Sequence, residues 1–177
     1  MASPRLTDPN FWRTVVLLLD MNDEGAMGIV LNRPSETSVS DPLPGWEQMI
    51  AAPDVVFVGG PVQPDVAIAL ACSKFESDNS DPEIFREVTD CVGTLSLGIG
   101  PTDASARFES IRVFAGYSGW SPGQLEGELD AGAWFIVTAA LEDMLSSDPQ
   151  EVWRRVLKRQ GGKLGMLANY PPNPSFN

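Results

Sequence analysis

Short apolar runs separated by turn-forming residues recur along most of the chain. Residues 13–20 and 26–32 are two such runs, rich in valine, leucine and isoleucine, and their composition predicts buried strands. Between them, residues 22–25 read Asn-Asp-Glu-Gly, which are residue types that favour tight turns. The pattern therefore predicts a β-hairpin near the N-terminus.

Five further runs of the same type predict additional strands. The first of them leads into Gly59, Gly60 and Pro61, a sequence typical of a tight turn. The polar residues 74–80 are the most loop-like part of the chain. The predicted strands are residues 55–58, 66–72, 91–97, 109–116 and 133–139.

Three segments favour helices. Residues 45–52 have helical composition, and residues 121–124, Ser-Pro-Gly-Gln, place a serine N-cap, a first-turn proline and a glutamine in order. Residues 148–151, Asp-Pro-Gln-Glu, repeat this signature and predict a helix that ends at the glycines 161–162. Because strands outnumber helices and several strands follow one another directly, we predict an α+β fold with a mixed sheet.

The composition indicates one domain with a substantial core. The chain has 177 residues, of which 43% are hydrophobic, so residues 1–177 should form a single domain. A domain of this size buries roughly 70% of the surface that its unfolded chain would expose. No apolar run approaches the roughly 18 residues of a membrane span, and the N-terminal residues lack the pattern of an export signal. We therefore expect a cytoplasmic protein without a membrane segment.

The chain is strongly acidic. It contains 24 aspartate and glutamate residues, 12 lysine and arginine residues and no histidine, which gives a net charge of -12. A phosphate backbone would approach against this field, so we do not expect direct binding of nucleic acid. Cys72 and Cys91 lie in apolar stretches and form no C-x-x-C pair, and we expect both to be buried, reduced thiols.

One serine invites comparison with a catalytic nucleophile. Residues 116–120, Gly-Tyr-Ser-Gly-Trp, resemble the G-x-S-x-G elbow that presents a serine between a strand and a helix. The final glycine comes one residue early, and the chain has no histidine to accept the proton of Ser118. We therefore do not expect Ser118 to be a nucleophile. The alternative is a turn in which two glycines bring Tyr117 and Trp120 against the core or a cleft.

Acidic residues provide an alternative chemistry, in which carboxylates or a bound metal serve an enzyme. Residues 20–25 resemble the first half of an EF-hand loop, but Leu31 stands where a glutamate must close the calcium shell. Glu126 and Asp130 lie four residues apart on a predicted helix, where a solvated acidic face is the simpler interpretation. We predict no metal site. The carboxylates that an enzyme would use are Asp23, Glu24 and Glu126.

The predicted helix after residue 151 carries apolar side chains on one face and basic side chains on the other. The basic face could bind an acidic surface or, through residues 151–163, a nucleic acid. Alternatively, its cations complement the dipole at the C-terminus of the helix. The basic face consists of Arg154, Arg155, Lys158 and Arg159.

Several of these segments together resemble one known family. The stretches NDEGAMGIVLNRPSE, VFVGGPV, VFAGYSGWSPGQLEGEL, GAWFIV and VWRRVLKRQGGKLGMLANYPPNPSFN are similar, in register, to the YqgE/AlgH family of bacterial proteins. The resemblance implies a mixed sheet curled into a small barrel-like core with helices around it. It also implies a name that comes from a proposed role in transcriptional regulation of alginate synthesis, without an established enzyme activity. Met21 departs from the family, which usually has a histidine there.

We therefore expect a non-catalytic protein with a regulatory role that binds a small ligand or a protein partner. The binding cleft should lie where the glycine-bearing turns converge, lined by polar and aromatic groups near strand ends. An enzyme that uses the three carboxylates and a nucleic-acid-binding protein are the alternatives, and we predict no cofactor. The predicted cleft consists of Asn32, Arg33, Gly59, Gly60, Tyr117, Ser118, Trp120 and Gln124.

Overall fold

The computed structural model describes residues 1–75 and 81–171. Its strands are β1 (Val16–Asn22), β2 (Gly25–Val30), β3 (Pro34–Ser38), β4 (Val55–Val58), β5 (Val62–Ser73), β6 (Phe85–Thr89), β7 (Val92–Leu95) and β8 (Phe108–Trp120). Its α-helices are α1 (Pro101–Arg107), α2 (Gln124–Asp130), α3 (Leu141–Met144), α4 (Val152–Gln160) and α5 (Gly162–Leu167). Short 3-10 turns occupy Glu47–Met49, Leu97–Ile99 and Pro149–Glu151.

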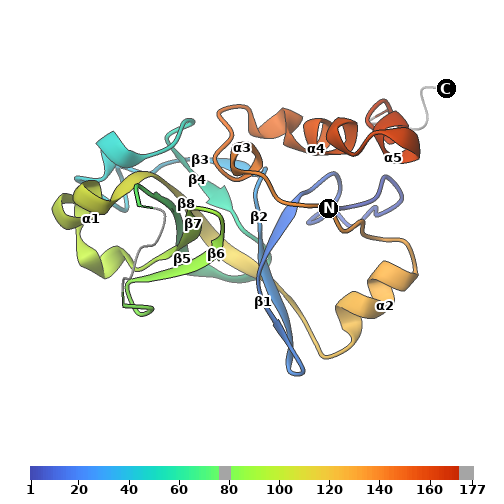
Figure 1. Ribbon diagram of the computed structural model, residues 1–177, viewed down its shortest axis with the longest axis horizontal. Coiled ribbons are helices and arrows are strands. Elements are labelled where there is room, and N and C mark those ends of the chain that lie inside the picture. The colour runs from blue at the N-terminus through green and yellow to red at the C-terminus, as the bar shows by residue number, and fades with distance from the viewer. Residues whose placement is uncertain (76–80, 172–177) are drawn as a thin grey trace.

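The longest strand, β8, organises the sheet. It pairs antiparallel with β5 along one edge, and on the other edge it pairs antiparallel with β2 and parallel with β4. The strand order is β1-β2-β8-β5-β7-β6, and β3 joins through β4. This sheet curls into a nearly closed barrel with the helices outside it (Figure 1). The structure thus confirms the predicted α+β class and the barrel-like core.

The barrel is not fully closed. In the described part of the chain, β1 and β6 are the two ends of the strand order and do not pair with each other. A side-chain contact spans the gap, since Arg86 Nη2 lies 3.7 Å from Asp20 Oδ2. We call this gap between β1 and β6 the open seam.

The N-terminal hairpin is confirmed. β1 and β2 pair antiparallel, and the pairing of Asn22 with Gly25 leaves a two-residue loop between the strands. Gly25 has a φ of +131°, which few residues other than glycine adopt, and a side chain there would overlap the backbone of Trp120. The turn therefore needs glycine both for its conformation and for its packing against β8.

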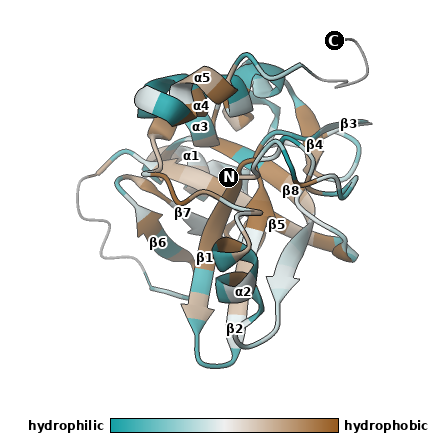
Figure 2. Cartoon of the chain, turned by 90° about the vertical axis from the view of Figure 1, so that its right-hand side faces the viewer, coloured by the Kyte–Doolittle hydropathy of each residue, from teal (hydrophilic) through white to brown (hydrophobic). Residues whose placement is uncertain are grey.

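The helices α3, α4 and α5 cover one end of the barrel, whereas α2 stands beside the β1–β2 hairpin (Figures 1 and 2). The apolar residues Val152, Trp153, Val156 and Leu157 of α4 are all buried in the main core, as the amphipathic pattern predicts. Burial of each such side chain contributes about 1.5–3 kcal/mol. The helix ends at Gly161, which has a φ of +66°, so its predicted end is confirmed.

Several predicted elements differ from the structure. β3 and β6 were not expected, because both carry polar residues on an exposed face. The helix expected over residues 45–52 is reduced to the turn Glu47–Met49. The short helix α1 and the helix α5 after residue 161 were also missed, because a single helical turn or two gives little apolar periodicity. Of the loop predicted at residues 74–80, residues 76–80 lie outside the described residues.

The segment 116–120 forms part of β8, not the predicted turn. Its register continues into the hairpin, where Gly28 pairs with Ser118 and Ala26 pairs with Trp120. The serine cap expected at the next helix is also wrong, because the N-cap of α2 is Gly123. Part of the capping pattern survives, since the backbone N–H of Ser121 donates to Gln124 Oε1 at 3.1 Å.

The segment 133–139 reads as a strand but has no strand partner. Its only bridge within the described residues joins Trp134 to Ala2. Its sequence is apolar and suits a strand, but the only described residues that pair with it are those at the N-terminus, around Ala2. Phe135 still bonds to Met1, but within the described residues the backbone groups of Ile136 and Val137 make no hydrogen bond.

The two cysteines form a disulfide, so the prediction of two reduced thiols is wrong for this structure. Spacing could not show the bond because the residues are 19 apart, but the antiparallel pairing of β5 with β7 brings their Cα atoms within 5.1 Å. The bond joins Cys72 on β5 to Cys91, directly before β7. None of the helices in the described ranges has the length and apolar character of a transmembrane span.

Candidate functional site

A hollow lined by apolar side chains lies over the open seam. It has a volume of about 320 Å³, in the range of small-molecule sites. The β1 strand, the end of β6, α2 and the segment 133–139 contribute to its walls. We call it the apolar groove, and its lining residues are Met1, Val16, Leu17, Leu18, Met21, Val88, Thr89, Trp120, Leu125, Leu129, Trp134, Phe135, Ile136, Val137 and Ala139.

The groove exposes large apolar side chains to solvent. Ile136 is 82% exposed, Met21 is 49% exposed and Leu18 is 39% exposed. Single exposed apolar residues are common on protein surfaces, but a group of them around one concavity is typical of a binding site. The exposed side chains therefore make this hollow the principal candidate site.

A carboxylate fixes the wall of the groove that α2 forms. Glu128 Oε2 accepts hydrogen bonds from the indole N–H of Trp120 at 3.0 Å and of Trp134 at 2.7 Å. Its other oxygen accepts from Gln124 Nε2 at 3.0 Å. The two indole rings meet edge to face, with centroids 5.8 Å apart. Both rings are thus held by hydrogen bonds as well as by packing.

The segment 135–139 alternates like a strand. Phe135, Val137 and Ala139 pack against the main core, whereas Ile136 and Thr138 are exposed. This period of two is the side-chain geometry of extended backbone. The segment therefore offers one face to the core and the other face to the groove opening and solvent.

The N-terminus anchors the start of this segment. The amino group of Met1 donates a hydrogen bond to the carbonyl of Phe135 at 2.8 Å, and the N–H of Phe135 donates to the carbonyl of Met1 at 2.8 Å. Burial lowers the pKa of the Met1 amine to about 6. Residues 136 and 137 lie just beyond this anchor.

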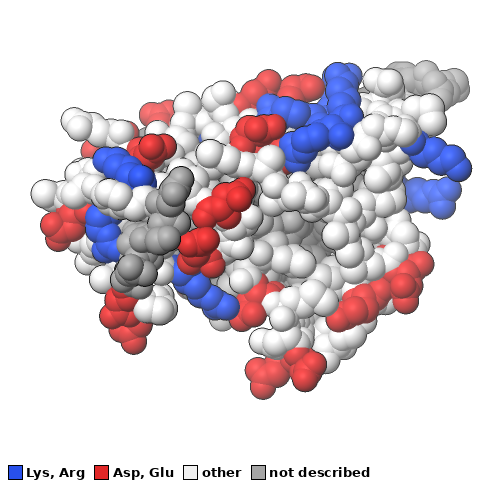
Figure 3. Space-filling view, viewed as in Figure 1, with Lys and Arg blue, Asp and Glu red and all other residues white. Residues whose placement is uncertain are grey.

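Acidic side chains surround the groove. In Figure 3 the hollow is bordered by acidic groups over the tip of the β1–β2 hairpin, over α2 and on the β6–β7 side. Arginines also adjoin this border. Arg86 contacts Asp20. Arg159 donates to the carbonyl of Thr138 at 3.2 Å, and it also binds Asp143. The acidic residues that flank the lining residues in sequence are Asp20, Asp23, Glu87, Asp90, Glu126, Glu128 and Asp130.

The predicted cleft is divided by the structure. Arg33 and Gly60 line a separate hollow of about 280 Å³ together with Pro9, Asn10 and Val58. The guanidinium of Arg33 donates through Nη2 to the carbonyl of Trp12 at 2.6 Å. Partial burial lowers the pKa of Arg33.

Three members of the predicted cleft, Asn32, Gly59 and Ser118, take part in hydrogen bonds that hold segments of backbone together. Asn32 accepts from the N–H of Val15 and donates to the carbonyl of Arg13, each at 2.9 Å. Ser118 is fully buried and donates its hydroxyl hydrogen to the carbonyl of Gly59 at 3.2 Å. These contacts use the polar groups of Asn32 and Ser118 to position β1, β2 and β8.

The remaining members are spread over three environments. A side chain at Gly60 would overlap the backbone of Tyr117, so the turn after β4 packs closely against β8. The ring of Tyr117 contacts the main core. Trp120 lies in the wall of the apolar groove, and Gln124 is exposed on α2, where it bonds to Glu128.

The carboxylates named for an enzyme are all at the surface. Asp23 and Glu24 form the exposed hairpin loop, and Glu126 is exposed on α2. Residues 1–75 and 81–171 contain no group of three or more histidine, cysteine, aspartate or glutamate side chains arranged around a common metal position. This exposure weakens the case for catalysis by these three groups, because catalytic carboxylates are usually held inside a cleft.

The arginines of the basic face have partners within the chain. Arg159 binds both carboxylate oxygens of Asp143, and Arg155 donates to Ser146 Oγ at 2.7 Å. Arg154 donates to the carbonyl of Ala168 at 3.2 Å. The hydrogen bond with Asp143 raises the pKa of Arg159. Arg155 and Arg159 thus meet the acidic side chain of Asp143 on α3 of the same chain, whereas Lys158 remains exposed.

Sequence reasoning missed the groove itself. Leu18 and Ile136 lie within runs that read as buried strands, and no local signal marks them as exposed. A hint was available at residues 133–139, where a strand-like sequence lies between two predicted helices with no adjacent strand in the sequence. Only the tertiary structure places these residues together around one hollow.

Comparisons with known proteins identify relatives across the whole chain. A UPF0301 protein from Streptomyces avermitilis is 46% identical over 178 residues, covering 100% of this chain and 92% of the relative. A UPF0301 protein from Mycobacteroides abscessus is 40% identical over 177 residues, covering 100% of this chain and 85% of the relative. These relatives carry no named activity.

Solved structures share the fold. A crystal structure of a Corynebacterium diphtheriae protein has a TM-score of 0.90 at 24% identity, over 96% of this chain and 88% of that chain. The solution structure of the AlgH protein from Pseudomonas aeruginosa has a TM-score of 0.68 at 30% identity, over 98% of this chain and 92% of that chain. The family model described as AlgH-like, DUF179, matches residues 1–165, and the chain therefore belongs to the AlgH-like family.

Proposed function

We propose that this protein is a non-catalytic binding protein with a regulatory role and that it binds its ligand or partner in the apolar groove. The observation that carries the proposal is the group of exposed apolar side chains, Leu18, Met21 and Ile136, around one concavity. Exposure of such groups to water is unfavourable by roughly 25 cal/mol per Å² of apolar surface, so a ligand that covers them gains affinity.

The wall of the groove supports a binding role. The indoles of Trp120 and Trp134 are already positioned by Glu128, so little side-chain entropy remains to be lost when a ligand arrives. The indole N–H groups of Trp120 and Trp134 already have their acceptor within the protein. The groove therefore resembles a preformed apolar site more than a centre of acid–base chemistry.

We place this function in the cytoplasm. Disulfides are uncommon there because cellular reductants keep thiols reduced. In the cytoplasm, cellular reductants should therefore open the Cys72–Cys91 bond that the structure shows. Alkylation of free thiols in intact cells checks the location, which would be wrong if the pair were fully oxidised there.

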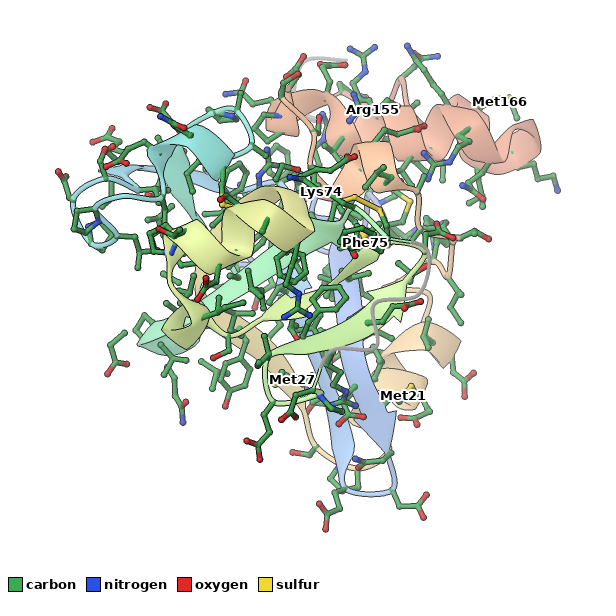
Figure 4. All side chains as sticks on the ribbon, turned by 60° about the vertical axis from the view of Figure 1, so that its left-hand side comes forward. Met21, Met27, Lys74, Phe75, Arg155 and Met166 are labelled. Atoms are coloured by element: carbon green, nitrogen blue, oxygen red, sulfur yellow. A yellow bond between two sulfur atoms is a disulfide. The ribbon has the colours of Figure 1, made fainter. Side chains whose placement is uncertain are left out.

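A neutral fluorescent probe, N-phenyl-1-naphthylamine, tests the binding function. Its emission should rise when it enters the groove of the native protein. The variant Ile136→Lys should weaken probe binding about tenfold or more, which corresponds to about 1.4 kcal/mol. Met166→Lys is the matched control, because Met166 is 67% exposed on α5, well separated from Met21 of the groove (Figure 4). Equal probe binding by both variants, or none by the native protein, would refute the proposal.

A further inference from the structure

Two stretches of backbone beside the apolar groove lack strand partners. β1 is the last strand of the sheet on its side, so one of its edges pairs with no strand of the described chain. In the segment 135–139, the N–H and C=O groups of Ile136 and Val137 make no hydrogen bond within residues 1–75 and 81–171. Unpaired edges of this kind are templates for another strand.

The side chains around these edges suit an extended occupant. Residues 135–139 already have the alternation of a strand, with Ile136 facing outwards. A strand rises by about 3.3 Å per residue, so an occupant of about five residues, roughly 17 Å long, would span residues 135–139, within which the backbone groups of Ile136 and Val137 are unpaired. A peptide in helical form would satisfy its own backbone and would leave these N–H and C=O groups unpaired.

The charge of the border selects the kind of segment. The acidic residues around the groove belong to a chain whose net charge is -12. A second copy would bring an identical acidic border against the first, and like charges across an interface oppose association. Lysine or arginine side chains on the occupant would instead be attracted to the border and would increase the association rate.

We propose that the apolar groove binds an extended segment of a partner protein by β-strand addition, and that apolar residues in this segment alternate with lysine or arginine. The backbone of the segment pairs with Ile136 or with Val137, whose backbone groups face opposite edges of the extended chain, or with the free edge of β1. Its apolar side chains enter the groove, and its basic side chains lie towards the acidic border. This inference rests on the proposed function, and it adds the conformation and charge of the partner.

The test uses a fluorescein-labelled probe peptide of four Lys-Val repeats and measures fluorescence polarisation at low salt. We expect the native protein to bind it. A peptide with glutamate in place of every lysine should bind about tenfold or more weakly, and raising the ionic strength to about 0.15 M should weaken the lysine peptide. The native affinity should fall in Ile136→Lys and remain unchanged in Met166→Lys.

Backbone N-methylation separates strand addition from simple apolar contact. Residues at alternate positions of a strand direct their backbone groups to the same edge. One probe peptide is N-methylated on its valines and another on its lysines, so that each loses the donors of one edge. Strand addition predicts that at least one of the two peptides binds about tenfold more weakly. Full binding by both methylated peptides would overturn the inference.

The neutral naphthylamine probe distinguishes failure of this inference from failure of the proposed function. If that probe binds in an Ile136-dependent way while none of the peptides binds or displaces it, the groove is a binding site and the strand-addition inference is wrong. If neither the probe nor the peptides bind, both are wrong. Equal affinity for the lysine and glutamate peptides would also overturn the inference, because the acidic border would then select nothing.

Discussion

The carboxylate of Glu128 holds one wall of the apolar groove in place, because it accepts hydrogen bonds from two indole groups. A buried donor without a partner costs about 1–3 kcal/mol. Removing this carboxylate would leave the N–H groups of Trp120 and Trp134 without their acceptor. The wall of the groove therefore depends on one side chain of α2.

We predict that Glu128→Ala lowers the free energy of unfolding by about 2–4 kcal/mol, because two buried donors lose their acceptor. Glu128→Gln should cost less, since its amide oxygen can still accept from both indoles. Urea denaturation followed by tryptophan fluorescence measures both changes. Glu126→Ala, on the exposed face of α2, should stay within about 0.5 kcal/mol of the native protein. If Glu128→Ala also lowered the free energy of unfolding by no more than about 0.5 kcal/mol, Glu128 would not be the acceptor that holds the two indoles.

The amine of Met1 predicts an unusual pH dependence. Its pKa is lowered from 8.0 to about 6 by burial, so the unfolded chain binds more protons between these values. Stability should therefore rise as the pH increases from about 6 to 8, by about 2–3 kcal/mol in total. Because the chain has no histidine, no side chain has an ordinary pKa near the middle of this window.

Urea midpoints of the untagged protein across this pH range measure the effect, with mass spectrometry to verify that Met1 is retained. Protein with an acetylated N-terminus serves as the control, because its amine cannot be protonated. If the stability of the unmodified protein changed with pH as little as that of the acetylated protein, the amine of Met1 would not be desolvated.

At the scale of elements, close contact between β8 and the turn after β4 explains two glycines. A side chain at Gly59 would overlap the backbone of Gly116, and one at Gly60 would overlap that of Tyr117. These contacts show why the sequence places glycines at residues 59 and 60. They also place Ser118 within reach of the carbonyl of Gly59. Gly59 and Gly60 thus allow the turn after β4 to pack against β8.

We expect Gly60→Ala to destabilise the protein by about 2 kcal/mol or more, because neither backbone can move away without breaking strand pairing. Gly127→Ala is a useful comparison, since Gly127 lies in α2 with no atom near its absent side chain. That change should stabilise the protein by about 0.5–1 kcal/mol through helix propensity. Thermal unfolding of the two variants measures both changes. Similar shifts of the melting temperature in the two variants would disprove the packing argument.

At the scale of the whole molecule, three properties meet in one place. The barrel remains open between β1 and β6, the backbone of residues 136–137 is unpaired, and acidic groups border the hollow. None of these properties alone specifies a partner. Together they favour a cationic extended segment over a second acidic copy, because the first completes the sheet and reduces the repulsion of a chain with charge -12.

Prediction from the sequence succeeded where the signal is local. The hairpin at residues 22–25 was identified because turn-forming residues separate two apolar runs, and the amphipathic helix α4 because its apolar residues recur on one face. β3 and β6 were missed because their exposed, polar faces resemble loops. Residues 133–139 were predicted to form a strand because they are apolar, but within the described residues only Trp134 of this segment forms a bridge.

The predicted cleft shows the same limit. Arg33 and Gly60 do line one hollow, and Trp120 lines another. The sequence indicates that Asn32 and Ser118 are polar residues near strand ends, but it does not show whether a ligand or the backbone satisfies them. In the structure both bind backbone groups.

The sequence by itself determined the α+β class, the acidic charge, the absence of histidine and thus of a Ser-His-Asp triad, because these follow from composition and local periodicity. Only the tertiary structure decided which apolar residues remain exposed, which cysteines meet and which strand-like segment stays unpaired. Those outcomes depend on the curvature of the sheet and on contacts between residues far apart in the chain. The apolar groove arises from such contacts, where the barrel fails to close.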